Sequence, residues 1–340
     1  MQGDCDCLAR RLVASDGGHG LHGVIIDGMP RPIDDLYLSP HFDDAVLSCG
    51  GTIHRRARAG RRQVVLTVCA GLPEGALTVF AEHHHRRWGA SAGDGLTSAL
   101  DMIARRRAED DAALAVLGAE AVRLDVADAI YRRTNDGRAP YDDLDRLFGL
   151  IDEGERGLVD AVASKLAEVA SGLGVGRRTR VWLPLAIGGH VDHRLTRAAG
   201  EAWLGRGLSG LLGRATFYED LPYAAMASAG EIRRMAPGMR RRRERIDEVD
   251  LAAKIAAVGC YASQISTFWA SDAAMAAEVR AWAVAAARGR MGSAGMVGGS
   301  GTERSGHDGS QTATSMVGSQ LAEARWLAGG TNTLEVGGAR

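Results

Sequence analysis

Two short clusters of histidine and aspartate could bind a metal ion. One lies in the segment SPHFDDAVLSCGG and the other in GGHVDHRLT. Together they contain His41, Asp43, Asp44, His190, Asp192 and His193. Imidazole and carboxylate groups are common ligands of catalytic divalent metals. A catalytic zinc needs three protein ligands and one open position, so this set offers enough ligands and leaves polar groups for proton transfer.

The first cluster has a simpler explanation when it is taken alone. It stands where a strand gives way to a helix, and Asp43 or Asp44 could cap the N-terminus of that helix. The second cluster favours the metal hypothesis, because it also follows an apolar strand and begins a helix. In open parallel sheets, ligands bind at the carboxyl ends of strands. The two clusters are therefore expected to face each other across one edge of a sheet.

The elements that must position these clusters follow from hydrophobic patterning and from glycine stops. The predicted strands are 34–40, 63–69, 121–126, 180–185 and 215–219. The predicted helices are 44–59, 100–117, two within 141–172, 193–204, and most of the chain from 220 to 288. Strands that alternate with helices are typical of an α/β fold. We expect a Rossmann-like three-layer sandwich with a mostly parallel sheet, and no dinucleotide fingerprint G-x-G-x-x-G follows any strand.

Composition divides the chain into four parts. Residues 1–33 read as an N-terminal extension, and residues 34–288 as the α/β domain. Residues 289–320 are rich in glycine and serine, which predicts a flexible segment. Residues 321–340 form a tail in which LAEARWLAGG predicts one helical turn that docks Trp326. The basic run GMRRRRERID is interpreted as a solvated helix face.

Overall composition excludes several classes of protein. The chain has 340 residues, 41 basic and 42 acidic side chains, and a net charge of -1, which argues against a dedicated nucleic-acid binder. No apolar run reaches the ~18 residues of a membrane span, and no signal peptide is evident, so a cytoplasmic location is expected. Five scattered cysteines make a disulfide framework improbable. A homo-oligomer is compatible with the sequence.

The two clusters, in this order, resemble the signature motifs of a known family. SPHFDDAVLSCGG and GGHVDHRLT are similar to motifs of the N-acetylglucosaminyl-phosphatidylinositol de-N-acetylase-like superfamily, also called PIG-L or LmbE-like. Four further segments resemble this family as well: RRAEDDAALAVLGA, DAIYR, YEDLPYA and KIAAVGCYASQ. The resemblance covers roughly residues 34–270.

This resemblance implies a metal-dependent active site. His41, Asp44 and His193 would bind zinc, although ferrous iron accepts the same ligand types. Asp43 would be the general base that takes a proton from the attacking water. The implied reaction is hydrolysis of an N-acetyl, or related N-acyl, group on an amino sugar or glycoside.

The resemblance also implies roles for residues around the metal. His190 would stabilise the oxyanion or protonate the departing amine, and Asp192 beside it would keep that imidazole charged. Arg106 and Asp128 match positions that hold the sugar. The chain departs from some relatives at Gly188, where those relatives carry a tyrosine that helps to bind the oxyanion. Donation to the oxyanion is then expected to fall more heavily on His190.

Two alternatives to this function stay open at this point. One is an amidase that acts on a thiol conjugate of an amino sugar, within the same family. The other is a non-catalytic carbohydrate-binding relative that keeps the fold. Secondary metabolism is one setting in which a deacetylase of this kind would work. The loops that would select the substrate are those at 70–99, 127–140 and 220–240.

Overall fold

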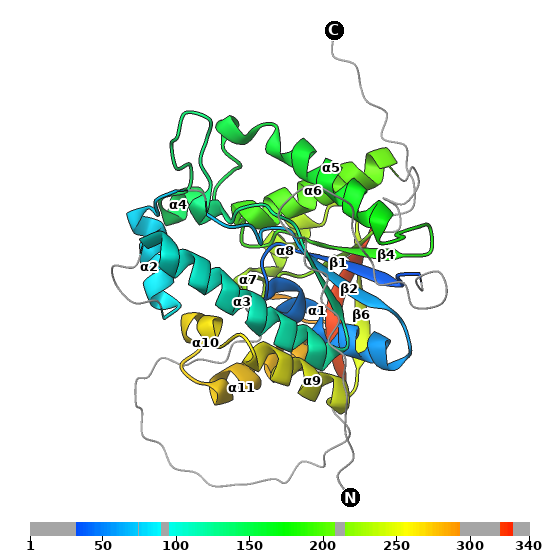
Figure 1. Cartoon of the computed structure of the whole chain (residues 1–340). Helices are drawn as coiled ribbons and strands as arrows, with labels where there is room; N and C mark the ends of the chain where they lie inside the picture. The colour runs from blue at the N-terminus through cyan, green and yellow to red at the C-terminus, as the bar shows by residue number, and fades with distance from the viewer. Residues whose placement is uncertain (1–31, 74, 90–94, 208–214, 293–319, 329–340) are drawn as a thin grey trace, which may run out of the picture.

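The computed structural model describes residues 32–73, 75–89, 95–207, 215–292 and 320–328 (Figure 1). Its strands are β1 (Asp35–Ser39), β2 (Gln63–Thr67), β3 (Glu120–Arg123), β4 (Arg180–Pro184), β5 (Thr216–Tyr218), β6 (Arg240–Ile246) and β7 (Leu321–Leu327). Its longer helices are α1 (Asp44–Arg58), α2 (Val79–Arg87), α3 (Gly95–Leu117), α5 (Leu158–Gly172), α6 (Val191–Gly207), α9 (Glu248–Gly259) and α11 (Asp272–Ala287). Its shorter helices are α4 (Leu144–Leu147), α7 (Tyr223–Met226), α8 (Ala229–Met235) and α10 (Ala262–Phe268), with 3₁₀ turns at Ala129–Tyr131 and Glu153–Glu155.

The strands form one seven-stranded sheet in the order β3-β2-β1-β4-β5-β7-β6. Strands β1 to β5 pair in parallel, whereas β7 pairs antiparallel with both β5 and β6. The predicted α/β fold with a mostly parallel sheet is confirmed. The chain winds outward from β1 to β3 and then returns to β4 on the other side of β1. Loops that follow β1 and β4 therefore meet at the point where the strand order reverses, which is where open α/β sheets bind ligands.

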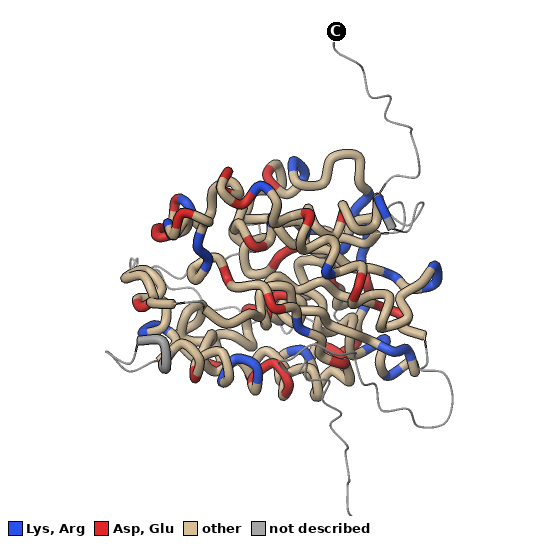
Figure 2. The backbone as a smooth tube through the Cα atoms, turned by 45° about the horizontal axis from the view of Figure 1, so that its top comes forward, with Lys and Arg blue, Asp and Glu red and all other residues tan. Residues whose placement is uncertain are grey.

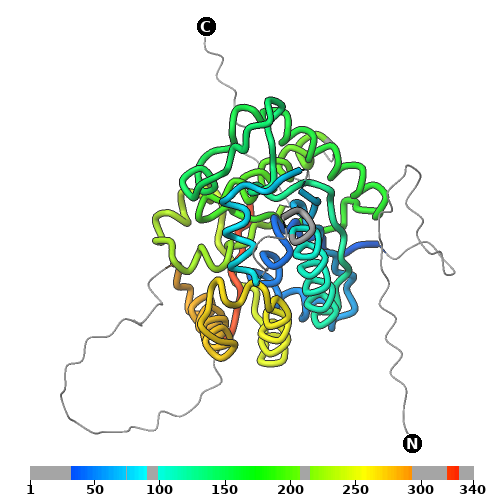
Figure 3. The backbone as a smooth tube through the Cα atoms, turned by 60° about the vertical axis from the view of Figure 1, so that its left-hand side comes forward, coloured from blue at the N-terminus to red at the C-terminus, as the bar shows by residue number. Residues whose placement is uncertain are grey.

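Helices cover both faces of the sheet, as the three-layer prediction requires. Figures 1 and 3 show α5 and α6 (green) on one side, and α9 and α11 (yellow to orange) on the other. Successive strand residues point to opposite faces. Leu36 and Leu38 join the core under α5 and α6, whereas Tyr37 joins the core under α1, α9 and α11. Tyr37 stacks there on Trp182 of β4 with ring centroids 5.0 Å apart.

The tail forms a strand, so the prediction of a helical turn at residues 321–330 was wrong. β7 lies between β5 and β6, and it supplies the backbone partners of both strands. Trp326 is buried as expected, and its Nε1 donates a hydrogen bond to Glu219 Oε1 at 2.9 Å. The residues of LAEARWL favour helices by intrinsic propensity, but pairing on both edges of the strand outweighs that preference.

Two other local predictions also fail. The arginine run lies on the edge strand β6 rather than on a helix, and its side chains reach acceptors such as Glu219, which binds Arg241 at 2.7 Å. Charged residues on an edge strand disfavour pairing with another chain. The segment 70–99, expected to be a loop, contains α2, which carries the three consecutive histidines of the sequence.

Some expectations fall outside the described part of the chain. The extension at 1–31 and most of the glycine- and serine-rich segment, 293–319, are not described. Among the described residues, none of the helices is long and apolar enough to cross a membrane. Basic and acidic positions are interspersed along the described backbone (Figure 2), in keeping with the near-zero net charge.

Candidate active site

The two predicted clusters meet at the carboxyl ends of β1 and β4. The first lies in the turn from β1 into α1, and the second at the start of α6. The capping explanation of the first cluster is wrong, since Asp43 makes no side-chain cap and Asp44 Oδ2 accepts from the His41 backbone N–H at 2.8 Å. Instead, Ser39 Oγ accepts from the Ala45 N–H at 3.0 Å. The first cluster is therefore free for other chemistry.

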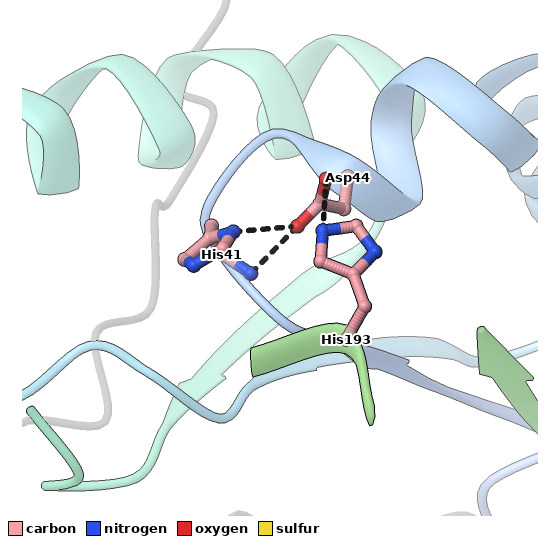
Figure 4. Close-up of side chains that lie close together, drawn as sticks. All are labelled: His41, Asp44 and His193. Atoms are coloured by element: carbon pink, nitrogen blue, oxygen red, sulfur yellow. Dashed lines mark hydrogen bonds and ion pairs between the residues drawn. The ribbon is translucent and has the colours of Figure 1, made fainter. Parts of the chain in front are cut away.

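Three side chains form a compact group that could hold one metal ion (Figure 4). His41 Nδ1 lies 3.1 Å from Asp44 Oδ2, and His193 Nε2 lies 3.4 Å from Asp44 Oδ1. One ligand atom from each residue lies within 4.8 Å of the others. His193 Nε2 is buried and has no hydrogen-bond partner among the described residues. The group thus offers two imidazole nitrogens, one of them buried without a hydrogen-bond partner, and a carboxylate. This set fits a divalent metal with an open coordination position.

The two histidines of this group are each held from behind by a carboxylate. His41 Nε2 lies 3.1 Å from Asp192 Oδ2, and His193 Nδ1 lies 2.7 Å from Asp220 Oδ1. Both aspartates are fully buried. A carboxylate that accepts from one ring nitrogen fixes the tautomer and directs the other nitrogen toward the metal. The arrangement therefore prepares His41 Nδ1 and His193 Nε2 as ligands.

Without a metal, this group favours protonated histidines. Burial lowers the pKa of His193, but the negative charge of Asp44 and the hydrogen bond to Asp220 outweigh burial and raise it to about 9. Burial also opposes the charged form of His41, yet Asp128, Asp192 and Asp44 raise its pKa well above the usual value. A metal must therefore displace protons in order to bind.

A second possible ligand group consists of His41, His190 and Asp192. Its members already have other partners: His190 Nδ1 accepts from the Asp192 N–H at 3.2 Å, and Asp192 accepts from the Ala129 N–H at 2.9 Å and from Arg132. The first group fits a metal better, because its ligand atoms face one another with fewer competing bonds.

His190 lies beside the metal ligands but differs from its predicted state. Its ring centroid is 4.9 Å from that of His41 and 5.4 Å from that of His193. Burial and the charge of His41 hold the pKa of His190 well below its usual value, so the ring is neutral. Since Nδ1 accepts a hydrogen bond, the neutral ring carries its proton on Nε2. His190 is then a neutral hydrogen-bond donor.

Asp192 was expected to keep the His190 ring charged, and it does not, because the pKa of that ring is held well below its usual value. The Asp192 carboxylate binds His41 and forms a buried ion pair with Arg132. Arg132 is held in turn by Glu155, whose Oε1 accepts from its Nε at 2.7 Å. The physical reason is that Asp192 is the first-turn residue of α6 and points back toward the loop after β3, where Arg132 lies. The charge of Asp192 still raises the pKa of His190, but burial and the charge of His41 outweigh that effect.

Asp43 is buried next to the group, and the structure shows no hydrogen bond from another described side chain to it. Arg106 Nη2 lies 3.7 Å from Asp43 Oδ1. Burial and the charge of Asp44 raise the pKa of Asp43, while Arg106 and His41 oppose that rise. Arg106 itself lies over the rings of Trp88 and Phe42, at 4.8 Å and 5.4 Å from their centroids. This packing fixes the guanidinium beside the carboxylate.

All eight residues predicted for the site lie together, and Asp128 completes the set. Asp128 Oδ2 lies 3.7 Å from His41 Nε2, and its Oδ1 accepts from the Ile130 N–H at 3.2 Å. Asp128 therefore caps the 3₁₀ turn after β3 as well as facing the histidines. The roles assigned to these eight residues remain predictions.

Sequence reasoning missed three residues of the site. Asp220 is fully buried behind His193, with its Oδ1 2.7 Å from His193 Nδ1. Arg132 belongs to the segment DAIYR, but no role was predicted for it. Tyr223 packs its ring edge against His193 at 5.4 Å. Their place in the sequence could have indicated a role in the site, because Asp220 and Tyr223 follow the carboxyl end of β5.

Comparison with known proteins agrees with this geometry. The family model of the GlcNAc-PI de-N-acetylases, PIG-L, matches residues 36–204. A protein of Niallia circulans named 2'-N-acetylparomamine deacetylase is 33% identical over 196 residues, which cover 55% of this chain and 66% of that protein. The match thus spans slightly less than two thirds of the relative.

Solved structures of similar shape include two deacetylases. The zinc-inhibited form of teicoplanin deacetylase Orf2 has a TM-score of 0.64 at 24% identity, covering 86% of this chain and 96% of that chain. The A40926 pseudoaglycone deacetylase Dbv21 has a TM-score of 0.58 at 26% identity, with the same coverage. The first likeness shows the fold alone. Together with the sequence match over both motifs, these findings show that the chain belongs to the PIG-L family.

Proposed function

We propose that this protein is a zinc-dependent hydrolase that removes the acetyl group from an N-acetylated amino sugar. One observation carries the proposal: His41, Asp44 and His193 offer three ligand atoms within 4.8 Å of one another, with Asp43 buried directly beside them. A site that only bound carbohydrate would have no use for a buried carboxylate next to a complete set of metal ligands. Zinc, when bound, would act as a Lewis acid toward water and the amide carbonyl.

Asp43 is suited to move the proton. Its raised pKa means that the carboxylate is a stronger base than an exposed aspartate. It can accept a proton from the attacking water and later return that proton to the departing amine. Arg106 and His41 oppose the rise in the pKa of Asp43 and so favour its carboxylate form.

His190 is suited to bind the carbonyl oxygen of the substrate. As a neutral ring protonated on Nε2, it donates one hydrogen bond without carrying a charge into the buried site. That hydrogen bond strengthens as negative charge develops on the oxygen. This assignment keeps the predicted role of His190 in oxyanion binding and removes its role as a cationic acid.

The substrate is proposed from the relatives and from the walls of the site. The relative named above acts, by its name, on 2'-N-acetylparomamine, and the two structures are deacetylases of teicoplanin and of the A40926 pseudoaglycone. We infer an N-acetylated amino sugar joined to a larger aglycone of secondary metabolism. Arg106 and Asp128, which flank the metal ligands, would bind the sugar hydroxyls.

Acetate release together with metal content tests the proposal. Zinc-loaded protein is expected to release acetate from at least one of three substrates: N-acetylglucosamine, 2'-N-acetylparomamine, or an N-acetylglucosaminyl glycopeptide. Asp43→Asn should keep one metal per chain and lose turnover by about 10²-fold or more. The control Asp160→Asn changes an exposed carboxylate on α5 and should leave both quantities unchanged.

The outcomes separate the alternatives. Sugar binding without acetate release in the parent protein would support a carbohydrate-binding relative. Cleavage confined to an amide of a thiol conjugate would support the amidase. Loss of metal from Asp43→Asn would show that Asp43 takes part in metal binding and would contradict its assignment as a base alone.

A further inference from the structure

Tyr223 fills the space that a side chain at position 188 would need. Gly188 has a φ of +86°, and a Cβ built on it would lie 2.8 Å from Tyr223 Cγ and 2.9 Å from Tyr223 Cβ. No real Cβ approaches other carbon atoms so closely, so a larger residue at 188 and this tyrosine exclude each other. The ring of Tyr223, the first residue of α7, therefore occupies the space that a side chain at position 188 would fill.

The tyrosine ring is fixed from two further sides. Its centroid lies 5.4 Å from that of His193, edge to face, and 5.9 Å from that of Phe148. Phe148 also lies 5.3 Å from His190. Tyr223 and His190 thus share one aromatic neighbour and both flank the ligand His193.

The hydroxyl of Tyr223 is available for a ligand. In the described part of the chain it forms no hydrogen bond, although the side chain is half-buried. Burial raises the pKa of Tyr223 well above its usual value, and the charges of Asp44 and Asp43 raise it further. The phenol therefore stays protonated and lies in the field of the site's carboxylates. The oxygen is not one of the fully buried unpartnered atoms of the described chain, so an atom of a bound substrate can reach it.

We propose that the Tyr223 hydroxyl donates a hydrogen bond to the oxyanion formed during amide hydrolysis, beside His190. The inference rests on the proposed function and adds a residue to it. In the step concerned, the water oxygen bonds to the carbonyl carbon, and the π-electron pair moves onto the carbonyl oxygen. Collapse reforms the C=O bond and breaks the C–N bond, and the amine leaves with the proton held by Asp43. Tyr223 keeps its own proton throughout.

Tyr223→Phe tests this assignment because it keeps the ring and its packing. Loss of one oxyanion donor is expected to lower kcat by about 10²-fold, with a smaller change in KM. The change should leave zinc content and thermal stability unaltered. Tyr37→Phe is the matched control, because it also removes a tyrosine hydroxyl. That hydroxyl is buried within the sheet, where it donates to Gln63 Oε1 at 3.2 Å. Tyr37→Phe should keep its kcat.

A binding measurement separates this assignment from the proposed reaction. Methylphosphonate, a small tetrahedral oxyanion, is titrated against zinc-loaded parent and zinc-loaded Tyr223→Phe. We expect about tenfold or greater weakening in the variant, since a hydrogen bond to a charged group is lost. Weakened phosphonate binding with no acetate release from the parent would uphold the oxyanion role and refute the deacetylase. The role of Tyr223 would be overturned if the parent and Tyr223→Phe bound the phosphonate equally, or if neither bound it. An unchanged kcat in Tyr223→Phe would overturn it as well.

Discussion

The support of His41 by Asp192 leads to a prediction about metal affinity. In the structure, Asp192 Oδ2 faces two donors, His41 Nε2 and the Ala129 N–H, and Oδ1 faces the Arg132 guanidinium. In Asp192→Asn, an NH₂ group must replace one of these oxygens and will oppose a donor in either orientation. The remaining oxygen should turn toward the charged Arg132, so His41 loses its support.

The size of the effect follows from these contacts. Loss of a carboxylate behind a metal-bound histidine typically costs 10- to 100-fold in metal affinity, which is about 1.4 to 2.7 kcal/mol. Arg132 loses one of two carboxylate partners in a buried site, so unfolding should become easier by about 3 kcal/mol. We expect both changes, whereas a role for Asp192 in charging His190 would change mainly the alkaline limb of the pH–rate profile.

Competition with a chromophoric chelator would measure zinc affinity, and urea denaturation would measure stability. Glu155→Gln is the matched control, because it disturbs the same arginine without contacting His41. It should lower stability and leave zinc affinity unchanged. Zinc affinity in Asp192→Asn equal to that of the parent, with an intact fold, would refute the reasoning. So would an equal loss of affinity in Glu155→Gln.

Three further predictions concern the ionisation of His193 and the buried ion pair between β7 and α9. Zinc affinity should fall as the pH is lowered below about 9, because His193 must lose a proton to bind, and calorimetry in buffers of different ionisation enthalpy should show proton release. The stability that protonated His193 gives to the metal-free protein is fully present below about pH 6.5 and should be lost as the pH rises through about 9, a trend measurable by denaturation across pH. Glu323→Ala should destabilise the protein by about 3 kcal/mol or more, measured in urea, because removing this carboxylate of β7 leaves the buried ammonium of Lys254, on α9, unpaired.

The metal cluster was predictable because its information is local. His41 and Asp44 are three residues apart in a turn that directly follows a strand, and His193 begins a helix after another. Parallel strand order then brings the two turns to one edge without further information. A short motif at the end of a strand thus specifies both the residue types and the place where they meet.

The supporting residues were not predictable, since tertiary packing selects their partners. Asp192 stands two residues from His190 in the sequence, yet its carboxylate points to His41 and Arg132, 151 and 60 residues away. Asp220 reaches His193 only because β5 pairs with β4. Sequence proximity was a poor guide to hydrogen bonding here, because helix geometry turns neighbouring side chains in different directions.

The outer strands were missed for a different reason. β6 is almost entirely arginine, and β7 is built of residues that favour helices, so neither shows the alternation of a typical strand. Their position is fixed by side chains that reach across the sheet. Glu323 of β7 accepts from the backbone N–H groups of Gly51 and Thr52 and from Lys254. Gly51 suits this contact, because a Cβ there would lie 2.7 Å from Ile246 Cδ1 and would force that side chain to shift.

The charges of the site explain why a divalent cation suits it. Its aspartates and arginines are Asp43, Asp44, Asp128, Asp192 and Asp220, together with Arg106 and Arg132. The aspartates outnumber the arginines, and buried carboxylates without a matching cation are costly. Without metal, protons on His41 and His193 supply the missing positive charge, which is why the pKa of each is raised. A divalent ion that replaces those two protons delivers the same charge, so it offsets the excess of carboxylates over arginines to the same extent.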